Sequence, residues 1–343
     1  MVGDKLASAT AQRPPTLAEV AAIAGVSLKT ASRAMNGEPR VAVQTRTKVL
    51  EAARSVGFRM NAMASQLARG VASNVIALIT GDLANPFYSR LAQGVEREMR
   101  LHGLHLSIAS SDEDAEAELA LLQDLAVRQV RGVLLSSTMQ SHEELHEIQL
   151  RGIPLVFVDR APVGLEADSF VLDNYGGART AIEHLLAAGH RRIAYVGDYA
   201  RLQPQRERRQ GFADALTLAG ITGWQAFVEE GAHDIDSAYR QVSALLRSSP
   251  PPTAVFAANN CITIGALKAI AESAPGTALV GFDDFDLADV IGVTTISHDP
   301  AEMGRLAARR LGELTNGRTR DTHHVVLKTR LIARGSGERP PSG

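Results

Sequence analysis

Short apolar runs separated by helix-length segments recur along most of the chain, and this alternation constrains the fold more than any other feature. Strands joined by helices run parallel, and the helices then cover both faces of the sheet. Four runs are followed by a second series of four, so we expect an α/β fold with two similar subdomains, each a doubly wound parallel sheet. The expected strands are Asn74–Thr80, Leu104–Ser110, Gly132–Ser137, Pro154–Asp159, Arg192–Asp198, Gln225–Gly231, Thr253–Asn259 and Ala278–Asp284.

Polar residues stand at the carboxyl ends of these expected strands. Ligands of open parallel sheets bind at that edge, so the set is a candidate binding site. Polar residues also follow strands in nearly every fold as caps and turns, and any single one is better explained in that way. The set comprises Asp82, Asp159, Asp198, Asn259, Asn260, Asp283 and Asp284.

Ahead of the alternating region, the segment 16–37 has the pattern of two short helices joined by a tight turn. Thr16 and Glu19 have the spacing of a capping box, Gly25 ends the first helix, and Ser27 stands where it can cap the second. A third amphipathic segment follows. Together the three segments predict a helix-turn-helix domain.

The second of these helices carries Lys29, Arg33 and Asn36 at helical spacing on one face. In a helix-turn-helix domain this helix enters the major groove, where Lys and Arg donate to guanine and Leu28 can meet a thymine methyl group. Residues 1–74 contain ten Lys or Arg against four Asp or Glu, which gives them a formal charge of +6. Because the net charge of the chain is −2, the remaining residues carry −8. Binding to a polyanion explains this asymmetry. A merely solvated polar face is the alternative.

The segment Phe58–Gly70 is rich in alanine and contains Leu67. It is too short to form a stable helix alone. At the end of a DNA-binding domain, such a helix could lie in the minor groove and insert Leu67 into a base step. A plain linker is the alternative.

No catalytic motif is found in the sequence. It lacks G-x-G-x-x-G after the first strand, G-x-x-x-x-G-K-[ST] and G-x-S-x-G, and its histidines lack metal-ligand spacing. We therefore expect no enzyme activity, no metal and no cofactor. Cys261 is a single cysteine, which excludes an internal disulfide. The absence of a membrane span and of an apolar secretory core leads us to expect a cytoplasmic protein.

Residues 16–70 resemble the head and hinge of the LacI/GalR family of bacterial repressors. The shared motifs are the AGVS turn, T-x-S-R, the N-G pair, V-x-x-x-T-R and N-A-x-A-x-x-L; the family's hinge usually begins with Pro-Asn, whereas Met60 precedes Asn61 here. The resemblance implies that Leu28 and Lys29 set operator preference. It implies DNA contacts by Thr16, Leu17, Ser27, Leu28, Lys29, Thr30, Ser32, Arg33, Asn36 and Arg40, and minor-groove contacts by Asn61, Ala64 and Leu67.

The resemblance continues from about Val75 to about Arg334, through NPFY, VDR, GFDD and TTISHDP. It implies a core similar to periplasmic sugar-binding proteins: two subdomains joined by three crossovers, two of them near His298 and Val325, with effector bound between. His233 stands where the family usually has an aromatic residue. The implied effector-binding residues are Phe87, Tyr88, Asp159, Arg208, His233, Asn259 and Asp283.

The sequence is therefore interpreted as a ligand-responsive transcriptional regulator, most simply a repressor. We expect a homodimer on a pseudo-palindromic operator, with a sugar, sugar acid or phosphorylated derivative as effector. The alternatives are a constitutive DNA-binding regulator with a degenerate pocket and a sugar-binding protein that does not act on DNA. The expected divisions are a disordered tail (1–13), the helix-turn-helix domain (14–60), the hinge helix and linker (61–72), a first subdomain (73–173 plus 298–325), a second subdomain (174–297 plus 326–335) and a disordered tail (336–343).

Overall fold

The computed structural model describes residues 13–59, 73–317 and 321–341 of the 343-residue chain. The chain forms two compact units, Met1–Ala72 and Ser73–Gly343, called here the head and the core. The expected hinge helix, with Asn61, Ala64 and Leu67, lies outside the described residues, as does nearly all of the expected N-terminal tail.

Residues 13–59 of the head form three helices, α1 (Leu17–Ile23), α2 (Leu28–Met35) and α3 (Val43–Ser55). The capping box is confirmed, because the Thr16 hydroxyl accepts from the Glu19 amide and the Glu19 carboxylate accepts from the Thr16 amide. Gly25 adopts a φ of 66°, which favours glycine, and so ends α1. The three helices bury a small core of Val20, Ala21, Ala31, Ala34, Val49, Ala52 and Ala53.

The first lobe of the core is a six-stranded parallel sheet in the order β11-β5-β4-β3-β1-β2. Helices α5 and α12 pack on one face, and α6 and α7 on the other. The elements are β1 (Val75–Thr80), α5 (Pro86–Leu101), β2 (His105–Ser110), α6 (Ala115–Val127), β3 (Gly132–Leu135), α7 (His146–Leu150), β4 (Leu155–Val158), β5 (Asp168–Leu172), α12 (Pro300–Thr315) and β11 (His324–Leu327).

The second lobe repeats this plan in the order β12-β10-β9-β8-β6-β7, with α8 and α9 on one face and α10 and α11 on the other. The short β12 pairs antiparallel with β10, so this sheet is mixed at one edge. The elements are α8 (Asn174–Ala187), β6 (Ile193–Val196), α9 (Gln203–Leu218), β7 (Val228–Glu229), α10 (Ile235–Leu246), β8 (Ala254–Ala257), α11 (Asn260–Ser273), β9 (Ala278–Phe282), β10 (Thr294–Ser297) and β12 (Arg330–Ile332).

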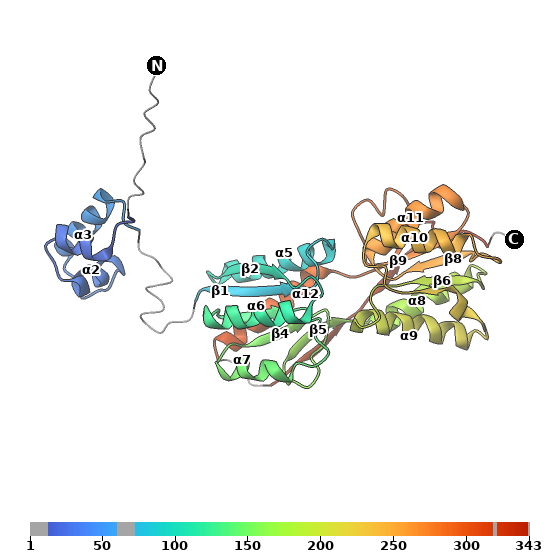
Figure 1. The fold of residues 1–343 in the computed structure, drawn as a ribbon, viewed down its shortest axis with the longest axis horizontal. Helices are drawn as coiled ribbons and strands as arrows, with labels where there is room; N and C mark the ends of the chain where they lie inside the picture. Colours follow the sequence, from blue (N-terminus) through green and yellow to red (C-terminus); the bar gives the residue numbers. More distant parts are fainter. Residues whose placement is uncertain (1–12, 60–72, 318–320, 342–343) are drawn as a thin grey trace, which may run out of the picture. The chain divides into compact units, whose positions relative to one another are not determined.

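All eight strands expected from the apolar runs are present, and each is shorter than the run that predicted it. The six-stranded order arises because the chain passes between the lobes three times: after Leu172, after Ser297 and after Leu327 (Figure 1). The crossing expected near Val325 follows Leu327, because β11 stays paired with β5 as far as that residue.

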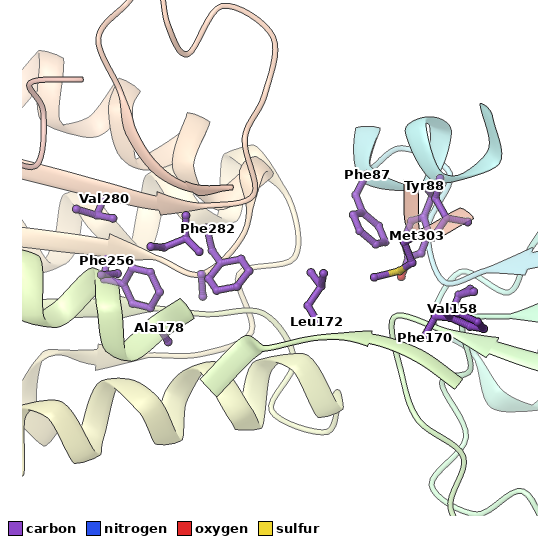
Figure 2. Close-up of a cluster of buried hydrophobic side chains, with 14 of the residues drawn as sticks. Phe87, Tyr88, Val158, Phe170, Leu172, Ala178, Phe256, Val280, Phe282 and Met303 are labelled. Carbon is purple, nitrogen blue, oxygen red and sulfur yellow. The ribbon is translucent and has the colours of Figure 1, made fainter. Parts of the chain in front are cut away.

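One apolar cluster beside the crossings includes side chains of both lobes (Figure 2). Phe87, Tyr88 and Met303 lie together in the first lobe, Phe256 and Phe282 in the second, and Leu172 between the two groups. Helices α5 and α12 pack closely at Gly94 and Gly304. A Cβ at Gly304 would lie 2.1 Å from the carbonyl oxygen of Leu91, so no larger residue fits without moving a helix.

The expectation of a disordered tail from residue 336 is wrong for the described residues 336–341. Ser336 is buried, its amide donates to the Gly292 carbonyl, and its hydroxyl donates to the Leu279 carbonyl and accepts from the Thr294 amide. The segment is ordered instead because its backbone satisfies groups beside β9 and β10 that burial would otherwise leave unpaired.

Candidate functional site

The surface of α2 presents the side chains expected to read DNA. Ser27 caps the helix, its hydroxyl accepting from the Thr30 amide at 3.1 Å. Leu28 is 55% exposed, and Lys29 and Arg33 are also exposed. The Arg33 Nε lies 3.4 Å from the Glu38 carboxylate, a weak surface ion pair that a phosphate or a base could replace.

The remaining expected DNA contacts lie around this helix. Asn36 ends α2, and its side-chain amide donates to the Ser32 carbonyl at 2.8 Å, so it also stabilises the end of the helix. Thr16 and Leu17 begin α1, and Arg40 is exposed in the loop after α2. Their contact with DNA stays a prediction.

A second candidate site lies between the two lobes, at the carboxyl ends of their strands. The pocket there has a cavity volume of about 40 Å³ and opens to solvent. Asp159 follows β4 and Asp283 follows β9, at equivalent places in the two sheets, and both adopt a φ of 68°. All seven residues expected to bind effector line this pocket: Phe87, Tyr88, Asp159, Arg208, His233, Asn259 and Asp283.

On the first-lobe side, a buried ion pair organises the wall. The Arg160 guanidinium donates to both Glu113 carboxylate oxygens, at 2.8 and 2.5 Å, and also to the Ser137 carbonyl and the Tyr88 hydroxyl. Burial by itself raises the pKa of Glu113, but hydrogen bonding and the charge of Arg160 outweigh it, and the pKa is lowered overall. Asp159 accepts from Tyr88 at 3.4 Å, and burial raises its pKa to about 6.

On the second-lobe side, Arg208 is held from several directions. Its Nε donates to Asn174 at 2.9 Å, its Nη1 donates to the Ala258 carbonyl at 2.6 Å and lies 3.5 Å from Asp283, and the guanidinium lies 3.7 Å above the Phe282 ring. The charge of Arg208 lowers the pKa of Asp283, but burial has the larger effect and raises it. Arg208 is therefore rigidly positioned at the pocket wall.

His233 links the two lobes across the pocket. Its ring stacks on Tyr199, with centroids 4.8 Å apart. Its Nδ1 lies 3.0 Å from the Asp198 carboxylate and its Nε2 3.9 Å from that of Asp82. The hydrogen bond that His233 donates to Asp198 is the main reason why the pKa of His233 is raised. Protonated His233 thus bridges an acidic group of each lobe.

Sequence reasoning found part of this site. Of the seven strand-end residues, Asp82, Asp159, Asp198, Asn259 and Asp283 line the pocket. Asn260 instead donates to Asn85 of the other lobe, and Asp284 pairs with Arg334. Lining residues that the sequence reasoning did not assign are Asn85, Glu113, Arg160, Leu202, Pro204 and Gln205. Position offered a clue for two of them, since Glu113 follows β2 and Arg160 follows Asp159.

In the described segments, no three His, Cys, Asp or Glu side chains are grouped so that they could hold a metal ion. None of the helices in these segments combines the length and apolar character needed to cross a bilayer. The pocket is lined by charged and amide side chains with a few apolar ones, which suits a small polar ligand.

A helix-turn-helix head followed by a two-lobed core with a polar pocket defines a class of protein, the ligand-binding transcription regulators. Two family models match: "Bacterial regulatory proteins, lacI family" over residues 16–61, and "Periplasmic binding protein-like domain" over residues 182–337. The transcriptional regulator CelR of Thermobifida fusca is 33% identical over 340 residues, which span 95% of this chain and 99% of CelR. The chain belongs to the LacI family of bacterial regulatory proteins.

Solved structures agree with this assignment. A complex of the regulator CelR with cellobiose is 31% identical, with a TM-score of 0.70 over 94% of this chain and 99% of that one. A lac repressor dimer bound to operator and an anti-inducer is 26% identical, with a TM-score of 0.79 over 95% and 99% of the two chains.

Proposed function

We propose that this protein is a transcriptional regulator, most simply a repressor, that binds operator DNA as a homodimer and changes its DNA affinity when a sugar or sugar derivative occupies the pocket. The observation that carries the proposal is one chain holding both an exposed, donor-rich α2 and a polar pocket between two lobes. The named relatives, a CelR–cellobiose complex and an operator-bound lac repressor dimer, support each half of it.

The head would provide sequence recognition. Lys29 and Arg33 are exposed donors, and Arg suits guanine O6 and N7 in the major groove. Leu28 and Lys29 are the proposed source of operator preference. The segment 61–72, with Asn61, Ala64 and Leu67, is proposed as a hinge that contacts the minor groove.

The pocket would provide the response, because its lining comes from both lobes. The lobes also meet directly: the Asn260 amide donates to Asn85 at 3.0 Å, and the Ala161 amide donates to Gln203 at 2.8 Å. A ligand held by both walls favours one arrangement of the lobes over others. A regulator responds only to such a difference in affinity between its states.

The proposed limits of the first lobe are 73–173 plus 298–327, and the second lobe comprises 174–297 plus 328–341. We place the protein in the cytoplasm, where its DNA would be, and assign it no enzyme activity, cofactor or metal. The relatives are named as regulators, which supports the absence of catalysis.

The test begins with selection of binding sites from random DNA by the full-length protein. Recovery of a pseudo-palindromic site, bound with an affinity that a sugar changes at least several-fold, is the expected result. Failure to enrich any sequence would refute the DNA-binding proposal. Enrichment of a site whose affinity no sugar changes, by a protein whose melting temperature no sugar changes, would favour a constitutive regulator with a degenerate pocket.

A further inference from the structure

The pocket between the lobes carries more acidic than basic side chains. Its lining includes five carboxylates, Asp82, Glu113, Asp159, Asp198 and Asp283, and two arginines, Arg160 and Arg208. With all five carboxylates ionised, the lining charge is −3 when His233 is neutral and −2 when it is protonated. A site with this excess of negative charge repels an anionic ligand, and the weak screening of a buried site preserves that repulsion.

The cations of the pocket are already paired with groups of the protein. Both terminal nitrogens of Arg160 donate to Glu113, and its Nε lies 3.6 Å from Asp159. Arg208 is held by Asn174, the Ala258 carbonyl and Asp283. A phosphate or carboxylate binds tightly where several charge-assisted donors are free to point at it. Here an anion would first have to displace acceptors that the protein supplies.

His233 is the residue that favours an anionic effector at the sequence level, because it stands where the family has an apolar ring. In the structure its two nitrogens face Asp198, at 3.0 Å, and Asp82, at 3.9 Å. Its positive charge is thus directed at two carboxylates. It cannot serve a ligand anion without leaving them.

Acceptors, in contrast, are in excess. Asp283 is 6% exposed, and its Oδ1 has no hydrogen-bond partner within the described ranges. Nδ1 of His298 lies 3.6 Å from this oxygen, and burial keeps that histidine neutral by lowering its pKa to about 3. An unpaired buried carboxylate oxygen is costly, and a ligand hydroxyl or protonated amine would satisfy it.

We propose that the effector carries no negative charge: it is a neutral or amine-bearing sugar whose donors bind Asp283 and Asp159, and sugar acids and sugar phosphates are rejected. This inference rests on the proposed function, because it concerns the same pocket. It narrows the effector class from sugars and their acidic or phosphorylated derivatives to the members with no anionic group.

The test is a charge-matched ligand series on the full-length protein. Glucose, galactose, ribose, cellobiose and glucosamine are compared with the phosphate monoesters, aldonic acids and uronic acids of the same sugars, by thermal shift and calorimetry. We expect at least one neutral or amine-bearing member to raise the melting temperature, and its anionic counterparts to bind about 100-fold more weakly. An anionic sugar that binds as tightly as its neutral counterpart would overturn the proposal. Absence of binding by every neutral and amine-bearing sugar would also overturn it.

Substitution of Asp283 tests the role of the unpaired oxygen. Asp283→Asn should weaken the binding of the responding neutral sugar by about 10-fold or more. It should also reduce the difference in affinity between that sugar and its anionic counterpart, because one negative charge is removed. The matched control is Asp289→Asn, the same chemical change at an exposed position outside the pocket. Equal sugar affinities for the two variants would contradict the assignment.

DNA binding by the same preparation separates this inference from the proposed function. Selective binding to a site recovered from random DNA, combined with an anionic effector, would overturn the inference and leave the regulator role intact. Absence of any selective DNA binding would remove the regulator role whatever sugar is bound.

Discussion

Replacing Glu113 with alanine breaks the buried ion pair that holds the first-lobe wall of the pocket. The side chains of Glu113 and Arg160 are 4% and 7% exposed, and the substitution removes two hydrogen bonds of 2.8 and 2.5 Å. Removing one partner of a buried pair costs about 3–5 kcal/mol, because the remaining charge is left buried. Arg160 keeps its bonds to the Ser137 carbonyl and the Tyr88 hydroxyl, with Asp159 3.6 Å away, so we expect a loss of about 3 kcal/mol.

This loss should lower the melting temperature by roughly 5–12 °C, given the size of the core. The pKa of Glu113 is lowered in the fold, so its contribution is present above the ordinary pKa and is lost as pH falls through the lowered value. The difference between wild type and Glu113→Ala should therefore shrink in acid. The measurement is differential scanning calorimetry at neutral and acidic pH.

The matched control is Glu183→Ala, which removes an exposed ion pair on α8. Glu183 contacts Arg179 at 2.7 Å, but both side chains are about half exposed, so we expect a change below about 0.5 kcal/mol. The argument from burial would be refuted if Glu113→Ala had the same melting temperature as the control variant. It would also be refuted if the loss of melting temperature relative to wild type were the same in acid as at neutral pH.

Three further predictions concern other parts of the chain. Arg33→Ala should weaken binding to the selected DNA site by about 10- to 100-fold in fluorescence anisotropy, while Arg54→Ala, also exposed in the head, changes it little. Ser336→Ala should cost about 1–3 kcal/mol in thermal unfolding, because the buried Thr294 amide loses its acceptor; exposed Ser273→Ala is its control. Burial raises the pKa of Asp159 from 3.8 to about 6, so this group's stability contribution is present below 3.8 and lost as pH rises through about 6. Asp159→Asn should accordingly raise the melting temperature of the sugar-free protein at neutral pH and lose that advantage near pH 3.8; an advantage that persists in acid would contradict the assignment.

Local signals explain which parts of the fold were predictable. The capping box of Thr16 and Glu19 and the cap at Ser27 depend on residues three positions apart, so the sequence alone predicts them. The central strands are buried on both faces and read as continuous apolar runs. Strand β11 has an exposed-intermediate alternation and pairs with a segment more than 150 residues away, so nothing local distinguishes it. Strand β12, with three residues and none of them buried, likewise offers no apolar run.

In the pocket, too, some features follow from local sequence and others depend on contacts between distant residues. Strand ends reveal Asp159, Asp198 and Asp283, because chain direction alone brings them to one edge. The partners that set their charge balance are visible only in three dimensions. Glu113 and Arg160 are 47 residues apart, and their pairing removes Arg160 from the donors open to a ligand. Sequence therefore predicts where the pocket lies, while its preference for ligand charge depends on contacts between distant residues.

The charge balance of the pocket also bears on how a ligand would change the state of the protein. Asp159 belongs to the first lobe and Asp283 to the second, and the charge of Asp283 contributes to the raised pKa of Asp159. The two carboxylates therefore repel each other across the pocket in the arrangement of the lobes seen here. Separating the lobes would relieve that repulsion, whereas a sugar that donates to both carboxylates stabilises the arrangement that brings them together. The same unpaired acceptors that reject an anion thus give a neutral sugar the difference in affinity between states that regulation requires.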